Sequence, residues 1–144
     1  MSIPDARFDE YVQLVVQHGA VRGRHSVATL VAIGAAESGL DNLAVGNNAR
    51  NGSPDSPAFY DLGLGWLQHD TYWLEQDRIV NGVEYDWRRI RSDPAYSLDL
   101  LVARPGMIVY QGQDCTYVRW QSWMVYPKKS DPFMRQAVDA YDRL

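Results

Sequence analysis

The sequence predicts a single, mainly helical domain (residues 1–144) in which a long polar loop or a short hairpin lines a cleft. Apolar residues recur at helical spacing near both ends of the chain, and the stretch 26–38 is almost wholly apolar. Residues 39–65 are instead dominated by Asp, Asn, Gly, Ser and Pro, which favour turns. A chain of 144 residues is long enough to bury a core without metal ions or disulfides.

The first two predicted helices cover residues 5–18 and 26–38. The first is amphipathic and ends at Gly19, and its apolar face consists of Phe8, Tyr11, Val12, Val15 and Val16. The second is apolar on nearly every side. We expect Ser26 to act as its N-cap and Gly39 to end it.

Shorter helices are predicted in the second half of the chain, followed by a last amphipathic one: residues 71–80, 85–91, 94–103 and 132–144. Asp70 or Thr71 caps the first of these helices, and Asp93 caps the third, which begins with a proline. Residues 107–126 fit either a buried strand or a helix, so both alternatives stay open.

The charge and composition exclude several classes of function. The net charge of −4 and the pI near 5.2 give no bulk attraction to nucleic acid or to an anionic membrane. We interpret Arg88, Arg89 and Arg91 as a solvated helix face. Cys115 is alone, which rules out an intramolecular disulfide and favours a buried apolar role. The three histidines lack metal-ligand spacing, so no metal or cofactor is expected.

Glu37 is the most informative residue of the chain, because a carboxylate here closes an almost wholly apolar helix. An ionised carboxylate is seldom buried without a partner. The last turn of a helix also presents the negative end of the helix dipole. Burial and dipole both raise a carboxyl pKa, which suits a general acid that works near neutral pH. Ser38 follows directly and offers a hydroxyl that can orient the carboxylate or a substrate.

A second motif, Gly65-Trp66-Leu67-Gln68, stands at the end of the polar loop. The glycine permits close approach of a backbone, and the Gln68 amide can donate to and accept from a sugar hydroxyl or an N-acetyl group. Since the loop joins this turn to the end of the Glu37 helix, we expect both motifs to line one cleft.

Together these motifs resemble the lysozyme-like superfamily, specifically goose-type lysozymes and soluble lytic transglycosylases of the phage-borne type. In that family a helix ends in Glu-Ser, a variable loop follows, and a Gly-Leu-Met-Gln-type turn leads into another helix. The matching residues here are Glu37-Ser38 and Gly65–Gln68, followed by His69-Asp70. The Trp-rich segment that ends in Tyr126 is similar to the later helices of phage-borne members. This turn departs from the family pattern in carrying Trp66-Leu67, and Tyr126 is followed by proline rather than asparagine.

The resemblance implies cleavage of the β-1,4 bond between N-acetylmuramic acid and N-acetylglucosamine in peptidoglycan, with Glu37 as the general acid. A transglycosylase then lets the muramyl 6-hydroxyl attack, whereas a lysozyme activates water with a further carboxylate. The candidates for that carboxylate are Asp61 and Asp70, with Asp41 and Asp55 behind them, and Asp70 also suits the N-cap of its helix. Because no partner stands out, we favour the transglycosylase.

The resemblance also implies the substrate contacts and the setting of the protein. Ser38, Tyr60, Trp66, Gln68 and Tyr126 are the expected substrate-binding residues, although core packing explains Tyr60 and Trp66 equally well. The expected partners are glycan strands and other virion tail proteins, with no nucleic acid. The chain shows no signal peptide and no apolar run of the ~20 residues that span a bilayer, so delivery by a virion or release at lysis is expected. The alternative is a non-catalytic glycan-binding or structural tail component of the same fold.

Overall fold

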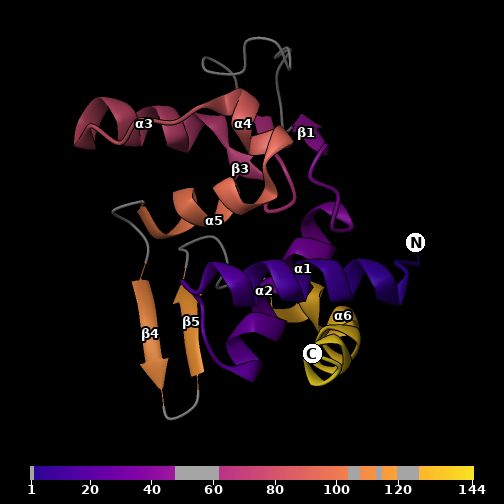
Figure 1. The fold of residues 1–144 in the computed structure, drawn as a ribbon. Coiled ribbons are helices and arrows are strands. Elements are labelled where there is room, and N and C mark those ends of the chain that lie inside the picture. The colour runs from indigo at the N-terminus through magenta and orange to yellow at the C-terminus, as the bar shows by residue number, and fades with distance from the viewer. Residues whose placement is uncertain (1, 48–61, 104–107, 113–114, 120–126) are drawn as a thin grey trace.

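The computed structural model describes residues 2–47, 62–103, 108–112, 115–119 and 127–144 (Figure 1). Within these ranges the chain is mainly helical, as the sequence predicts. The helices are α1 (Asp5–His18), α2 (Arg24–Ser38), α3 (Thr71–Asn81), α4 (Trp87–Ser92), α5 (Pro94–Ala103) and α6 (Pro127–Asp142). The strands are β1 (Val45–Asn47), β2 (Leu62–Leu64), β3 (His69–Asp70), β4 (Ile108–Gly112) and β5 (Cys115–Arg119).

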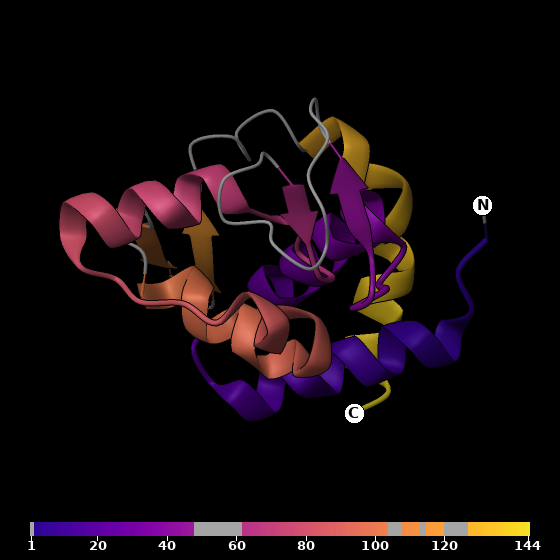
Figure 2. The ribbon, with the colours of Figure 1, turned by 90° about the horizontal axis from the view of Figure 1, so that it is seen from above.

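Helices α1, α2 and α6 pack together on one side of the molecule (Figures 1 and 2). The bounds of α1 agree with the prediction, and its buried residues are Phe8, Tyr11, Val12 and Val15. The predicted start of α2 is wrong: the N-cap is Gly23, and Ser26 is buried inside the helix. The earlier start lets Arg24 form a bidentate ion pair with Asp142 of α6, with N–O distances of 2.7 and 2.8 Å. Helix α6 likewise begins before the predicted residue 132.

A small antiparallel sheet follows α2, in the order β1-β2-β3. Val45 pairs with Leu64 across the first two strands, and Gly63 pairs with Asp70 across the second two. The predicted long loop or short hairpin therefore contributes two paired strands among its described residues, and the strand after the Gly65–Gln68 turn adds a third. Residues 48–61 lie outside the described part of the chain.

Helices α3 and α4 pack against the sheet and α5 packs against α4. Polar side chains cap the first turns of all three helices. Asp70 accepts a hydrogen bond from the Tyr72 amide at 2.8 Å, and Asp93 accepts one from the Ala95 amide at 3.1 Å. Both caps confirm the sequence prediction. Asp86 caps α4 in the same way, which the sequence analysis missed.

The described buried residues form two hydrophobic clusters. The large core joins α1, α2 and α6 and also takes in Trp66 and Leu67. The small core consists of Leu62, Leu64, Leu74, Ile90 and Leu100. Helix α5 connects the two, because Leu98 and Leu101 pack in the large core while Leu100 packs in the small one. Residues 107–126 fit either a strand or a helix by sequence, and for residues 108–112 and 115–119 the structure shows strands, because β4 and β5 pair in antiparallel orientation.

Candidate functional site

The C-terminal end of α2 carries Glu37 and Ser38, and both residues are partly buried. Most of the preceding helix is enclosed by protein, because residues 26–28 and 30–35 are all buried. The helix ends where Gly39 adopts a left-handed conformation with φ 69°. The Gly39 amide donates to the Ala35 carbonyl at 2.9 Å, and the Leu40 amide donates to the Gly34 carbonyl at 3.4 Å. The sequence therefore places a carboxylate at the edge of the large core, at the negative end of a helix dipole.

The Ser38 hydroxyl connects this helix end to the second motif. Its Oγ lies 2.8 Å from the Trp66 carbonyl oxygen and 3.1 Å from that of Gly34, so its proton is directed at backbone carbonyls. The same oxygen accepts the Asp41 amide at 3.2 Å. The structure thus brings the two motifs into direct contact, although 28 residues separate Ser38 from Trp66. It gives Ser38 a role in joining backbone segments, and its contact with substrate stays a prediction.

The turn at residues 65–68 depends on a glycine and on an unusual conformation at Gln68. Gly65 has φ +77°, and a Cβ there would lie 3.1 Å from the Ile90 carbonyl oxygen. Gln68 is a non-glycine residue with φ 52°. Its amide nitrogen Nε2 donates to the carbonyls of Gly65 at 2.9 Å and Ala44 at 3.3 Å. The side chain therefore closes the turn and ties it to Ala44, the residue before β1. The contact between Gln68 and a sugar stays a prediction, and it would use the amide oxygen.

Trp66 is a core residue, which is the packing alternative that the sequence left open for it. Its exposed fraction is 0%. The ring lies against Gly34 of α2 and 4.9 Å from the ring of Tyr11, and its Nε1 donates to the Pro94 carbonyl at 3.0 Å. The turn inserts this indole into the large core because a tryptophan buries a large apolar area and still finds a partner for its N–H.

The candidates for a second carboxylate differ in what the structure shows of them. Asp70 caps α3, which is the structural alternative the sequence allows. Asp41 is exposed and accepts the Leu43 amide at 2.9 Å. Asp55 and Asp61, together with the predicted sugar contacts Tyr60 and Tyr126, lie outside the described residues.

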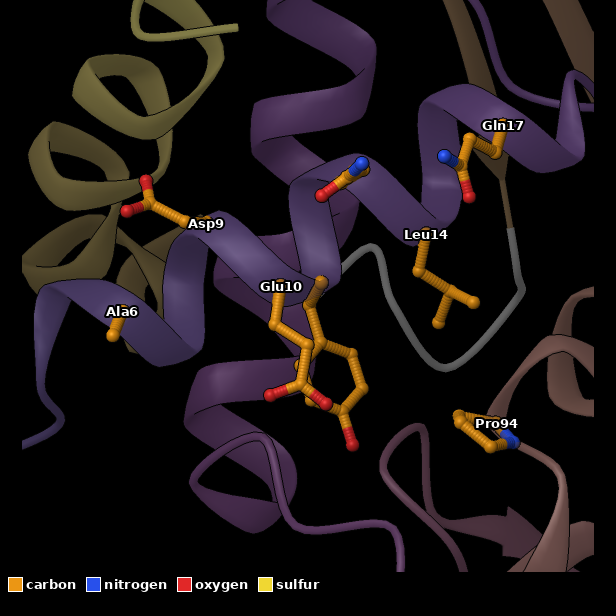
Figure 3. Close-up of a pocket in the computed structure, with 8 residues that line it drawn as sticks. Ala6, Asp9, Glu10, Leu14, Gln17 and Pro94 are labelled. Carbon is orange, nitrogen blue, oxygen red and sulfur yellow. The ribbon is translucent and has the colours of Figure 1, made fainter.

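A separate pocket of about 520 Å³ lies between α1 and the start of α5 (Figure 3). It is lined by one face of α1 and by Pro94, and none of the site residues predicted from the sequence lines it. Burial, followed by the nearby charge of Glu10, raises the pKa of Tyr11 in its wall to about 12, so this phenol stays neutral at physiological pH.

The described residues contain no group of three or more His, Cys, Asp or Glu side chains arranged to hold a metal ion. Among the described helices, none combines the length and the apolar character needed to cross a bilayer.

The polar groups that fix the backbone between α2 and β1 were not predicted from the sequence. Asn42 accepts the Trp66 amide at 3.3 Å, while Arg7 and Arg91 donate to carbonyls in this segment. Arg91 thus departs from the predicted solvated face, whereas Arg88 and Arg89 are exposed. No local pattern marks such residues, because each bond spans more than 20 positions along the chain.

The chain matches no family model, no curated protein and no solved structure.

Proposed function

We propose that this protein cleaves the β-1,4 bond between N-acetylmuramic acid and N-acetylglucosamine in peptidoglycan, with Glu37 as the general acid. One observation carries the proposal: the Ser38 hydroxyl bonds to the Trp66 carbonyl at 2.8 Å. This bond brings the Glu-Ser end of α2 against the Gly-x-x-Gln turn, the two motifs on which the resemblance to goose-type lysozymes and lytic transglycosylases rests. A carboxyl at the end of an enclosed helix, beside a small sheet, suits protonation of a glycosidic oxygen.

The surroundings of Asp70 favour a single-acid reaction. Its carboxylate accepts the Tyr72 amide and so has a structural role at the start of α3. In a transglycosylase, Glu37 first protonates the leaving oxygen. As a carboxylate it then takes the proton of the muramyl 6-hydroxyl as that oxygen attacks the anomeric carbon. The product is a 1,6-anhydro end, and no water is consumed.

The test is digestion of purified peptidoglycan by the wild type and by Glu37→Gln. We expect the wild type to release muropeptides with anhydro ends, which mass spectrometry distinguishes from reducing ends by the mass of one water. Glu37→Gln keeps the size of the side chain but removes the proton donor, so its activity is expected to fall by at least about a hundredfold.

The matched control is Glu84→Gln, which alters an exposed carboxylate outside both motifs and is expected to retain full activity. If the wild type released nothing, or if Glu37→Gln were as active as the wild type, the catalytic assignment would be refuted. Reducing ends in place of anhydro ends would refute the transglycosylase reaction and support hydrolysis.

A second candidate function is a non-catalytic glycan-binding or tail component of the same fold. Two predicted sugar contacts are turned inward, which counts against a catalytic cleft and so favours a role without cleavage: Trp66 is buried, and the Gln68 amide nitrogen is bonded to two carbonyls. Co-sedimentation with insoluble peptidoglycan separates the two candidates. Binding by both the wild type and Glu37→Gln, with no release of muropeptides by either, would support the second.

A further inference from the structure

The backbone that leaves α2 makes a reversal directly after Glu37 and Ser38. Gly39 and Leu40 adopt left-handed conformations in succession, with φ 69° and 56°. The left-handed region is costly for a residue with a Cβ, and such a conformation persists only where its surroundings hold it in place. The Leu40 side chain is fully buried, which supplies part of that restraint.

Arg7 of α1 supplies a second restraint on the reversal. Its Nη1 donates to the Leu40 carbonyl at 2.8 Å in a partly buried setting, across 33 positions of the chain. The other polar contact of this guanidinium, with Glu10, is longer at 3.8 Å. The hydrogen bond to the Leu40 carbonyl is thus the shorter of these two contacts of Arg7.

Arg91 of α4 holds the next turn of the same segment. Its Nε and Nη2 both donate to the Leu43 carbonyl, at 3.1 and 2.8 Å. The Leu43 side chain is 65% exposed, so packing does little to fix this residue. The fork of N–H groups on one carbonyl is specific to a guanidinium, because an ammonium group presents a single point charge.

The residues between these two carbonyls are bonded to the site itself. The Asp41 amide donates to the Ser38 hydroxyl, and Asn42 accepts the Trp66 amide. The Ala44 carbonyl accepts the Gly65 amide at 3.0 Å. Residues 40–44, which we name the 40–44 segment, therefore join the end of α2 to the 65–68 turn. Two guanidinium groups hold the segment, that of Arg7 at the Leu40 carbonyl and that of Arg91 at the Leu43 carbonyl.

We propose that Arg7 and Arg91 are positioning residues that hold the 40–44 segment, and through it the Glu37 end of α2, in register with the 65–68 turn. Neither residue is assigned a contact with substrate. The catalytic part of this inference rests on the proposed peptidoglycan cleavage, whereas the structural part does not.

The structural part is tested by hydrogen–deuterium exchange of the intact protein, with the exchange of residues 38–44 as the readout. Arg7→Ala and Arg91→Ala are each expected to speed exchange there by at least about tenfold while the centre of α2 stays protected. The matched control is Arg22→Ala, because the Arg22 Nε also donates to a backbone carbonyl, that of Gly19 at 3.1 Å, but away from the segment. Unchanged exchange in both arginine variants would overturn the inference whether or not the protein is an enzyme.

The catalytic part is tested with solubilised peptidoglycan, well below the melting temperature of each variant. We expect Arg7→Ala and Arg91→Ala to lower kcat by at least about tenfold with little change in KM, because misplacing a catalytic group affects the chemical step. Arg7→Lys is expected to restore most of the activity, since one donor replaces one bond, whereas Arg91→Lys loses the fork and restores less.

The outcomes separate the two ideas. An active wild type with unchanged kcat in both alanine variants would overturn the positioning role. An inactive wild type would refute the proposed function, and the exchange experiment would then decide the role of Arg7 and Arg91 by itself.

Discussion

The two hydrophobic cores of this molecule are stabilised in different ways. In the described residues the large core contains 20 buried residues and the small core five. Apolar helix faces build the large core, so its stability comes mainly from area removed from water. The small core lies under short strands and short helices, which depend on side-chain caps such as Asp70 and Asp86. The small core is therefore expected to unfold first.

The candidate site lies where the two cores meet. The sheet sends Leu62 and Leu64 into the small core, while the following turn sends Trp66 and Leu67 into the large one. The turn that contacts the Glu37 helix end is thus held by both cores. We therefore expect substitutions that destabilise the small core also to disturb the candidate site, because residues 62–68 connect the two.

The largest expected effect is from Trp66→Ala, which empties the place where the turn enters the large core. Loss of a buried indole costs about 3–5 kcal/mol of unfolding free energy. Chemical denaturation measures it, with Trp73→Ala as the matched control because Trp73 is 53% exposed and should cost less than about 1 kcal/mol. Equal losses in both variants would contradict the assignment of Trp66 to the core.

Gly34→Ala tests the close approach of α2 and the turn. An added Cβ would lie 2.5 and 2.7 Å from two carbons of the Trp66 ring. Overpacking of this kind costs about 1–3 kcal/mol, although alanine by itself favours a helix by about 1 kcal/mol over glycine. We expect a net loss of stability for Gly34→Ala, and a smaller loss when Trp66→Leu makes room for the methyl group. A stabilised Gly34→Ala would show that the two elements are not in tight contact.

Substitutions of Asp70 distinguish a structural role of its carboxylate, as the cap of α3, from a chemical role. Asp70→Ala removes the cap of α3 and is expected to cost about 1 kcal/mol. Asp70→Asn keeps a capping oxygen but no charge, so it should retain stability and, if Asp70 is only a cap, full activity on peptidoglycan. An Asp70→Asn variant that is stable but inactive would instead identify Asp70 as the second carboxylate.

The smallest expected effect is the pH dependence that Glu75 gives to the small core. Its hydrogen bond from Arg78, aided by one from the Tyr85 hydroxyl, lowers the pKa of this carboxyl below the ordinary 4.5. The stabilisation is therefore present above pH 4.5 and is lost as the pH falls through the lower folded-state pKa. In melts between pH 6 and pH 3, Glu75→Gln should show a slightly smaller decrease of Tm than the wild type. An identical decrease would exclude this contribution.

The sequence predicted much of the helical framework. The amphipathic pattern gives α1 its bounds, and Gly39 ends α2. Asp70 and Asp93 cap the helices for which they were predicted. Each of these signals is local, because helix periodicity and capping act over one or two turns of chain. The predicted N-cap at Ser26 is wrong, and here a non-local contact is involved: α2 begins at Arg24, which forms an ion pair with the distant Asp142.

What the sequence by itself determined about this protein is the order of its helices and the position of Glu37 at the end of a buried helix. Only the tertiary structure decided that Ser38 contacts the Trp66 carbonyl, that the Trp66 ring points inward and that Gln68 folds back on its own turn. Arg7 and Arg91 belong to the same class, because their carbonyl partners lie 33 and 48 residues away. Such contacts depend on how separate elements pack, and neither residue type nor local spacing specifies that packing.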